Sequence, residues 1–169
     1  NGTTWTNTFG IPMGNSEKII STSTGFLIFS SASIVTSTYF YSSDAASWSY
    51  VGSSSAINDL AAKGTRIVGV RRGAAEAVYS DNDGATWTTV SMPSPGRYVT
   101  SQWERITVAN GKFIALSDTG KCATSTDGIT WTYASPICLT MNYPLLASSG
   151  TRVMALDRFG AWNYTRDFV

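Results

Sequence analysis

The sequence predicts an all-β protein, a β-propeller of four blades, and three observations support this prediction. Charged residues make up only 14% of the 169 residues while aromatic residues make up 12%, a balance typical of strand-rich chains. Tryptophans at positions 5, 48, 87 and 131 recur at intervals of 43, 39 and 44 residues, each after a short polar segment. Two apolar runs joined by a turn precede the later copies. Repeats of about 40 residues with four short strands are typical of propeller blades.

Each repeat is expected to hold four strands. The first two are paired apolar runs, at 18–22 with 25–29, 58–62 with 66–70, 105–109 with 112–116, and 145–148 with 152–156. Gly64, Gly111 and Gly150 stand in the turn of three of these pairs, which is a hairpin signal. The third strand runs into a polar turn, and the fourth begins at the tryptophan. The predicted blades are 16–52, 56–92, 104–136, and 144–169 together with 1–8.

The two ends of the chain are expected to complete one blade. The last repeat stops before its tryptophan, and the chain begins with the missing strand at 1–8. Joining the ends would place Trp5 43 positions after Trp131, in step with the other intervals. Such pairing would remove two exposed sheet edges. A closed four-bladed ring, two chains in one eight-bladed ring and a piece of a longer propeller all remain open, and the matching interval favours closure within or between chains.

The polar segment before each tryptophan resembles the Asp-box, or BNR repeat, of sialidase-like β-propellers. The pattern Ser-x-Asp-Gly-x-Thr-Trp is matched best at 125–131, and it recurs with substitutions at 42–48, 81–87 and 1–5. The matching residues are Trp5, Asp44, Trp48, Asp83, Gly84, Trp87, Asp127, Gly128 and Trp131. The resemblance covers all four repeats and therefore implies the fold. Because Asp-boxes occur in sialidases, other glycosidases, sorting receptors, lectins and phage tail or fibre proteins, it does not choose the activity.

These Asp-box residues are expected to be structural. A carboxylate in a tight turn can accept hydrogen bonds from several turn amides, and glycine permits a left-handed backbone there. The tryptophan ring is large enough to pack between neighbouring blades. The resemblance implies that these turns lie on the face opposite the ligand site. The alternative interpretation is that these aspartates bind a ligand or act as acids.

Composition excludes several classes of chemistry. The chain has no histidine, which removes His-based general-base catalysis, Ser-His-Asp triads and nearly every catalytic zinc site. Its net charge of +1 gives no broad attraction to nucleic acid. No apolar run reaches the length of a membrane span, and no Gly-rich phosphate loop or paired metal-ligand spacing occurs. We therefore expect no cofactor, no metal, no nucleic-acid partner and no membrane span.

The loops on the face opposite the Asp-box turns are expected to hold any ligand. They are 8–17, 52–59, 92–104 and 135–145 between blades, and 30–38, 71–76, 117–121 and 157–160 within them. These loops carry the candidate ligand-binding residues Arg71, Arg97, Trp103, Tyr143 and Arg158. Arginine forks beside aromatic rings suit recognition of a carboxylate-bearing or neutral sugar.

A sialidase-like site can also be assigned from the resemblance. It would use three arginines, a Tyr–Glu pair and an acid/base Asp, which here would be Arg71, Arg97, Arg158, Tyr143, Glu104 and Asp59. The Arg-Ile-Pro signature of sialidases is absent, sialidases resemble six-bladed rings, and no arginine here matches a family motif. These departures argue against the assignment.

The two cysteines, Cys122 and Cys138, flank the third polar turn symmetrically and could face each other across that hairpin. In an oxidising compartment they would form a cross-strand disulfide. The alternative is two buried thiols that act as small apolar side chains.

The function predicted from these observations is a non-catalytic binding or structural propeller. Low charge, the absence of histidine and a chain made only of repeats favour a phage virion component, such as a tail fibre or surface appendage that mediates attachment. Its partners would be other virion or surface proteins in a homo-oligomer or larger assembly, and its location extracellular or on the virion. The alternatives are a carbohydrate-binding lectin and a sialidase-like glycoside hydrolase.

Overall fold

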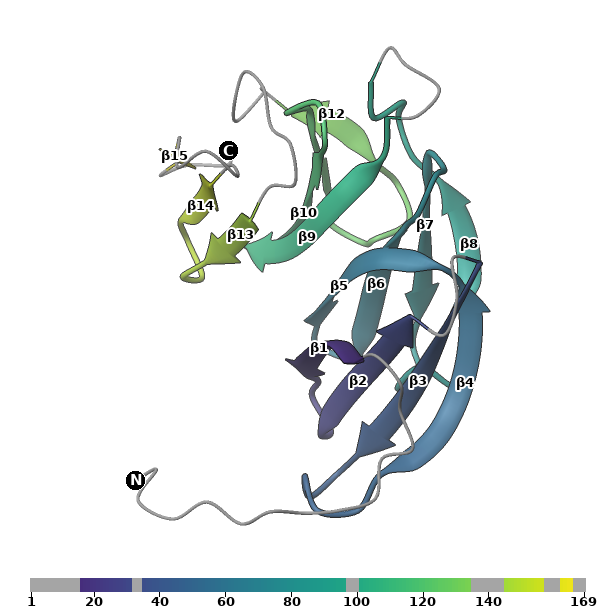
Figure 1. The fold of residues 1–169 in the computed structure, drawn as a ribbon. Coiled ribbons are helices and arrows are strands. Elements are labelled where there is room, and N and C mark those ends of the chain that lie inside the picture. The colour runs from purple at the N-terminus through teal and green to yellow at the C-terminus, as the bar shows by residue number, and fades with distance from the viewer. Residues whose placement is uncertain (1–15, 32–34, 97–100, 135–144, 157–161, 166–169) are drawn as a thin grey trace.

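The computed structural model describes residues 16–31, 35–96, 101–134, 145–156 and 162–165, and every regular element in them is a β-strand (Figure 1). The prediction of an all-β protein is therefore confirmed for this part of the chain. The described residues contain no helix long and apolar enough to cross a membrane.

The strands form four antiparallel sheets in chain order, which we call sheets 1 to 4. Sheet 1 comprises β1 (Ser16–Ser21), β2 (Phe26–Ser31), β3 (Thr36–Ser42) and β4 (Ser49–Ser55). Sheet 2 comprises β5 (Ile57–Lys63), β6 (Arg66–Arg71), β7 (Glu76–Ser80) and β8 (Thr88–Ser91). Sheet 3 comprises β9 (Trp103–Ala109), β10 (Lys112–Ser117), β11 (Cys122–Ser125) and β12 (Thr132–Ala134). Sheet 4 comprises β13 (Leu145–Ser148), β14 (Val153–Leu156) and β15 (Trp162–Thr165).

The four sheets follow one another in an arc (Figure 1). β1 packs against β5, β5 against β9 and β9 against β13, so the first strand of each sheet is its inner strand. The described strands show no comparable packing of β13 against β1, and their arc is therefore open between sheets 4 and 1. Residues 1–8 lie outside the described part of the chain, so their pairing with the last blade stays a prediction.

Apolar side chains fill the spaces between consecutive sheets. Leu27, Phe29 and Tyr39 of sheet 1 form one buried cluster with Leu60 and Ile67 of sheet 2. A second cluster joins sheets 2 and 3, and a smaller one joins sheets 3 and 4. The core is thus divided into layers between consecutive sheets, and sheets 2 and 3 each have a neighbouring sheet on both faces.

Two tryptophans lie in these layers between sheets. The Trp87 ring, just before the last strand of sheet 2, stacks on Tyr39 of sheet 1 with ring centroids 4.4 Å apart. Trp131 of sheet 3 is buried in a cluster with Val68 and Val70 of sheet 2. Each of these rings therefore joins its own sheet to the preceding one, and such stacking adds to the area that the rings bury.

Several boundaries differ from the prediction; the loop expected at 30–38, for example, overlaps β3, which begins at Thr36. The sequence predicts a loop at 52–59, but β4 continues to Ser55 by pairing with β3, and Ala56 alone separates it from β5. This segment is rich in Ser and Gly, as loops often are, yet its backbone pairs with β3 as part of the sheet. The last strand of each of the first three sheets begins one residue after the tryptophan, not at it. At Trp87 and Trp131 the indole N–H turns back to bond the turn itself.

Candidate functional site

The turns that precede the last strand of sheets 1 to 3 are closed by side chains, and we call them capped turns. They run at 42–48, 80–87 and 125–131. In the third, one oxygen of Asp127 accepts hydrogen bonds from the amides of Ile129 and Thr130, at 2.9 and 2.8 Å, and from the Ser125 hydroxyl. These amides lower the pKa of the Asp127 carboxyl to about 2. The carboxylate is therefore committed to its own turn.

The first capped turn repeats this arrangement around Asp44. Its Oδ1 accepts from the amides of Ala46 and Ser47, both at 2.8 Å, and from the hydroxyl of Ser42. The amide of Ser47 makes the largest contribution to a lowered pKa of the Asp44 carboxyl. The turn amides thus stabilise the ionised carboxylate of Asp44, as they do that of Asp127.

The second capped turn requires a correction to the assigned motif. Asn82, not Asp83, accepts the hydrogen bonds from the Ser80 hydroxyl and the Thr86 amide, both at 2.9 Å. Asp83 has a left-handed φ of 54° and accepts instead from the Thr24 hydroxyl of sheet 1. The turn holds one residue more than its counterparts, which an alignment without gaps hides. The Ser80–Asn82 spacing, identical to Ser42–Asp44, is the signal that locates it.

The glycines and tryptophans of the second and third turns hold equivalent positions. The amides of Gly84 and Gly128 donate to the serine hydroxyls of their turns, at 3.0 and 2.7 Å. The indole N–H groups of Trp87 and Trp131 donate to the carbonyls of the same glycines. These groups are thus used within the turns, and a ligand site must be sought elsewhere.

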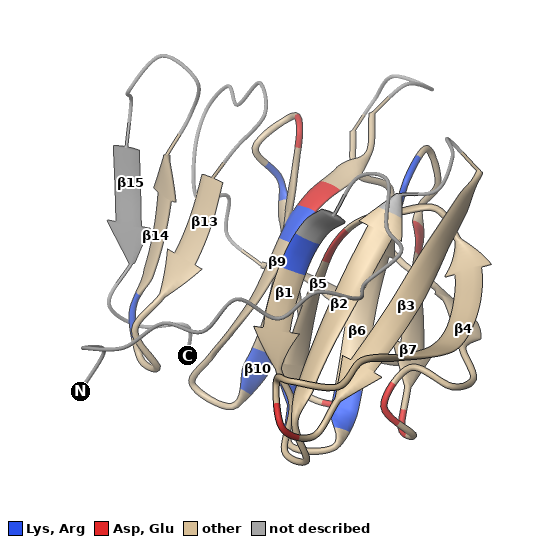
Figure 2. Cartoon of the chain, turned by 60° about the horizontal axis from the view of Figure 1, so that its bottom comes forward, with Lys and Arg blue, Asp and Glu red and all other residues tan. Residues whose placement is uncertain are grey.

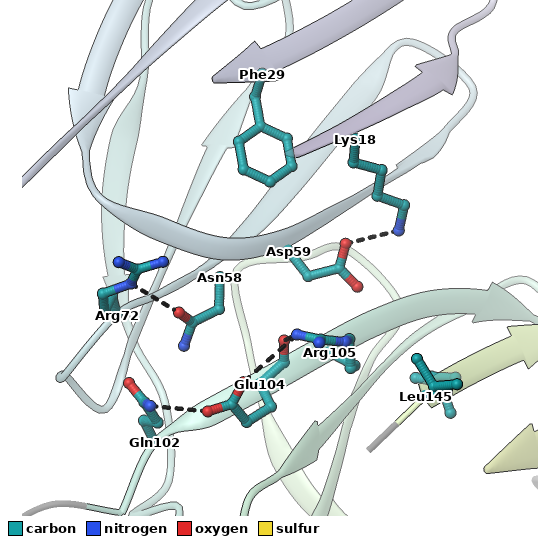
Figure 3. A pocket seen from close by; sticks show the side chains of 10 residues that line it. Lys18, Phe29, Asn58, Asp59, Arg72, Gln102, Glu104, Arg105 and Leu145 are labelled. Carbon is teal, nitrogen blue, oxygen red and sulfur yellow. Dashed lines mark hydrogen bonds and ion pairs between the residues drawn. The ribbon is translucent and has the colours of Figure 1, made fainter. Parts of the chain in front are cut away.

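A cavity of about 580 Å³ lies where the inner strands of the first three sheets meet sheet 4 (Figure 3). Its lining is mainly polar and charged and comes from all four sheets and the segments beside them: Lys18, Phe29, Asn58, Asp59, Arg72, Gln102, Glu104, Arg105, Leu145 and Leu146. Charged positions are sparse on most strands but are adjacent on β9 (Figure 2). The volume falls within the range of small-ligand sites.

Asp59 joins three inner strands at the wall of this cavity. It is buried on β5, and its Oδ1 lies 2.6 Å from the Lys18 ammonium of β1 and 2.9 Å from the Leu60 amide. Its Oδ2 accepts from the Ile106 amide of β9 at 3.0 Å. Both oxygens are therefore occupied, and the carboxylate fastens sheets 1, 2 and 3 together.

Glu104 is the second buried carboxylate at the wall. Its oxygens accept from the Gln102 side-chain amide at 2.8 Å and, more weakly, from Arg105 at 3.4 Å. Burial, the largest effect, raises the pKa of the Glu104 carboxyl. Asp118, whose amide and carboxylate bond the Gln102 backbone, also has a pKa raised by burial. The two acidic groups lie close enough for the charge on Asp118 to raise the pKa of Glu104 further.

Arg72 marks the exposed part of the lining. Its Nε donates to the Asn58 side-chain oxygen at 3.1 Å, and the Asn58 amide donates to the Trp103 carbonyl at 2.9 Å. Within the described part of the chain, the two terminal nitrogens of Arg72 donate no hydrogen bond. They are guanidinium donors that the site offers to a ligand.

Of the candidate ligand-binding residues named from the sequence, the two that the structure describes, Arg71 and Trp103, do not line this cavity. Arg71 pairs with Glu76 outside the lining, and its Nε is buried with no partner among the described residues. Trp103 is fully buried in the core, with its indole N–H donating to the Pro93 carbonyl at 3.1 Å, so its ring offers no face to a sugar. Three candidates lie outside the described residues: Arg97, Tyr143 and Arg158.

The acidic pair of the sialidase-like assignment does reach the cavity, since Asp59 and Glu104 both line it. The lining residues that the sequence did not single out are Lys18, Asn58, Gln102 and Arg105. Lys18 and Arg105 lie on strands, outside the loops in which ligand-binding residues were expected. The useful signal would have been their position near the start of successive inner strands, at 18, 58–59 and 104–105.

Cys122 is buried beside Ala109, Ile114 and Val153 between sheets 3 and 4, and burial raises the pKa of its thiol to about 12. Cys138 lies outside the described residues, as does Trp5. The disulfide and its alternative of two buried thiols therefore both stay predictions. No group of three or more potential metal ligands occurs among the residues described by the structure.

Comparison with known proteins identifies the fold. No protein-family model and no curated protein match the chain. The solved structure of YCF48 bound to D1 peptide superposes with a TM-score of 0.67 and 13% identity, over 98% of this chain and 55% of that chain. YCF48 from Cyanidioschyzon merolae gives 0.64 and 10%, over 95% and 59%. The GH74 enzyme of Niastella koreensis gives 0.60 and 17%, over 92% and 24%.

These neighbours are β-propellers, so the chain has a propeller fold. It spans a little over half of the two YCF48 chains and about a quarter of the GH74 enzyme. At such low identities the likeness concerns the fold and not the activity.

Proposed function

We propose that this chain is a non-catalytic binding module whose cavity takes an extended polar segment of a partner protein. The observation that carries the proposal is the composition of the wall, where amide and guanidinium groups surround a space of about 580 Å³. Such groups match the carbonyls and carboxylates that a peptide segment presents. The propeller of known structure that is bound to D1 peptide gives a precedent for this use of the fold.

A peptide is favoured over a sugar because the described wall lacks an exposed aromatic ring. Phe29 is the aromatic residue of the lining, and it is buried in the layer between sheets 1 and 2. Sugar rings are commonly held by an aromatic face, and Trp103 presents none. The lectin remains the second candidate.

A non-catalytic role is favoured by the state of the two carboxylates. Glycoside hydrolysis needs two carboxyl groups free to act on one bond. Both oxygens of Asp59 are occupied by Lys18 and by backbone amides, which leaves Glu104 alone. Hydrolysis of a panel of chromogenic glycosides, sialosides included, that is abolished by Glu104→Gln would overturn this part of the proposal.

The proposal is tested with two probes, a displayed library of random heptapeptides and a glycan array. We expect selected peptides to bind, and isothermal titration of the best one to show at least about tenfold weaker binding to Arg72→Ala, because a charge-assisted hydrogen bond is lost. Arg152→Ala is the matched control, since Arg152 lies on the exposed turn between β13 and β14. Its affinity should equal that of the wild type.

Two results would overturn the peptide proposal. One is the absence of any peptide that binds above background. The other is a peptide whose affinity is the same for the Arg72 and Arg152 variants. Binding confined to glycans, and dependent on Arg72, would replace the proposal by the lectin.

We further propose that this module acts on an extracellular or virion surface, as in a phage tail fibre. The low charge, the absence of histidine and the resemblance to Asp-box propellers support this placement. Labelling of purified virions with an antibody against the chain tests it. Particles that carry no label would contradict it.

A further inference from the structure

Equivalent residues make the packing contact between each pair of consecutive sheets. These residues define the surface that each sheet presents to the next. In the first three sheets the second strand directs one side chain toward the following sheet: Leu27, Val68 and Ile114. A Cβ built on Gly84 of sheet 2 would lie 3.1 Å from Leu27, and one on Gly128 of sheet 3 would lie 2.5 Å from Val68. The second and third capped turns thus pack on the sheet before them.

Met154 is the fourth copy of this position. In every sheet the residue just before it on the second strand pairs with the last residue of the third strand, as Val153 pairs with Thr165. Leu27, Val68 and Ile114 are each 0% exposed, whereas Met154 is 48% exposed. A side chain that is covered by the next sheet in three copies is therefore uncovered in the fourth.

At the opposite end of the arc, sheet 1 has an uncovered residue on the face that would meet a preceding sheet. Leu60 and Ile106, on the inner strands of sheets 2 and 3, point toward the preceding sheet and are 0% and 1% exposed. The strand registers make Ile19 the equivalent residue of sheet 1, and it is 56% exposed. Among the described residues, no sheet covers this position of sheet 1 as the preceding sheet covers it in sheets 2 and 3.

Ile19 begins an apolar row that crosses sheet 1. Ile19 pairs with Ile28, Ile28 with Phe40, and Phe40 with Tyr50, so one side chain from each strand shares this face. The rings of Phe40 and Tyr50 meet edge to face at 5.9 Å, and Tyr50 is 60% exposed. The two ends of the row, Ile19 and Tyr50, are exposed, while Ile28 is 8% exposed. Exposed apolar side chains that share one face mark interaction surfaces.

We propose that a second copy of this chain covers both faces, sheet 4 of each copy packing on sheet 1 of the other in one ring of two chains. The exposed face of sheet 4 corresponds to the face that sheets 1, 2 and 3 each present to the following sheet. The exposed face of sheet 1 corresponds to the face that sheets 2, 3 and 4 each present to the preceding sheet. A second copy presents the required partner to each. A head-to-tail contact used twice closes a ring when the rotation matches, and the arc corresponds to just over half of a longer propeller chain.

The test is the native mass of the purified chain and of two charge variants. Wild type should form a dimer of twice 18.1 kDa. Ile19→Asp and Met154→Lys should each raise the dimer dissociation constant by about 100-fold, because an unpaired charge is buried in the contact. Ile129→Glu is the control, since Ile129 is an exposed apolar residue in the capped turn of sheet 3. This control should remain dimeric.

Mixing the two variants distinguishes this head-to-tail ring from any other dimer. An equimolar mixture of Ile19→Asp and Met154→Lys contains one unaltered contact and one contact with opposite charges, so dimers should return. The return of dimers also shows that both variants are folded. A monomeric wild type at 100 µM (about a hundred times a typical micromolar constant), a dimer unaffected by either variant, a mixture that stays monomeric, or an open chain of many copies would each overturn the proposal.

Discussion

At the scale of single residues, the capped turns show how one side chain can replace several backbone contacts. One oxygen of Asp127 accepts hydrogen bonds from two turn amides, which would otherwise be bonded to water. Asn82 accepts from one turn amide, that of Thr86, and from the Ser80 hydroxyl with an uncharged oxygen. The requirement of the turn is therefore an acceptor at this position, and the negative charge adds to it.

The charge at Asp127 makes a pH-dependent contribution to stability. Its pKa in the folded protein is about 2, below that of the unfolded chain, so the contribution is present at neutral pH and is lost as pH falls toward about 2. We expect Asp127→Ala to lower the melting temperature by about 3 °C at pH 7, corresponding to about 1 kcal/mol. Thermal melts between pH 7 and pH 2 should show this difference shrinking.

Asp127→Asn is the matched control for that experiment, because Asn82 already fills the equivalent place. It should cost less than the alanine variant at pH 7. Equal losses for the two variants would show that the accepted hydrogen bonds do not matter.

Glu104 is expected to have the opposite pH dependence. Burial raises its pKa in the folded protein, so its ionisation disfavours folding, and stability from its proton is lost as pH rises through the raised pKa. Glu104→Gln should therefore raise the urea midpoint at pH 7 and leave it unchanged near pH 4, where wild type is itself protonated. A lower midpoint for the variant at pH 7 would mean that its bonds to Gln102 and Arg105 outweigh burial.

At the scale of elements, sheet-to-sheet packing depends on turns that have no room for a side chain. Gly128 has φ of +74°, and a Cβ there would lie 2.5 Å from Val68 of the preceding sheet. Gly64 has φ of +60°, but a Cβ there would meet nothing within 4 Å. A comparison of substitutions at these two glycines therefore separates the energetic cost of backbone strain from that of a clash between sheets.

We expect Gly64→Ala to cost about 1 kcal/mol, since only the left-handed backbone is penalised. Gly128→Ala should cost about 3 kcal/mol, because Val68 must also move. Urea unfolding of the two variants gives the comparison. Equal costs would show that the turn can withdraw from sheet 2 without loss.

Asp59 connects three inner strands, and its loss should weaken all of their contacts together. We expect Asp59→Ala to cost about 3 kcal/mol, since it leaves the Ile106 amide buried without a partner and the Lys18 ammonium unpaired. Lys18→Met should cost less than about 1 kcal/mol, because the Lys18 side chain is part-exposed and the carboxylate keeps both amides. Unfolding free energies from urea titrations test both values, and a larger loss for the lysine variant would contradict this assignment.

At the scale of the whole molecule, the proposed ring makes stability depend on concentration. Because each chain acts as a ligand for the other, the melting temperature of a dimer rises with protein concentration. We expect the wild-type melting temperature to rise between 1 and 100 µM protein, a range that brackets about micromolar association, while that of Met154→Lys stays constant. A constant value for wild type would argue against the second copy.

The repeats predicted the strands because the apolar runs and turns that form each hairpin are neighbours in the sequence. Paired apolar runs with a glycine turn, as at Gly64 and Gly111, predict hairpins from neighbouring residues alone. The serine-rich segment before Ala56 failed as a loop prediction because its pairing with β3 is a contact across the chain. The role of Asn82 was missed because an alignment without gaps pairs Asp83 with Asp44, and the hydrogen bonds that Asn82 accepts identify it.

The sequence by itself determined an all-β chain of four similar units and the chemistry that it excludes. The tertiary structure decided which charged residues meet. Lys18, Asp59 and Glu104 are far apart in the chain, and they share a cavity because the inner strands of successive sheets converge. It also decided that Trp103 is core and that Ile19 and Met154 are uncovered. Burial depends on what packs against a residue from distant segments, and no local pattern contains that information.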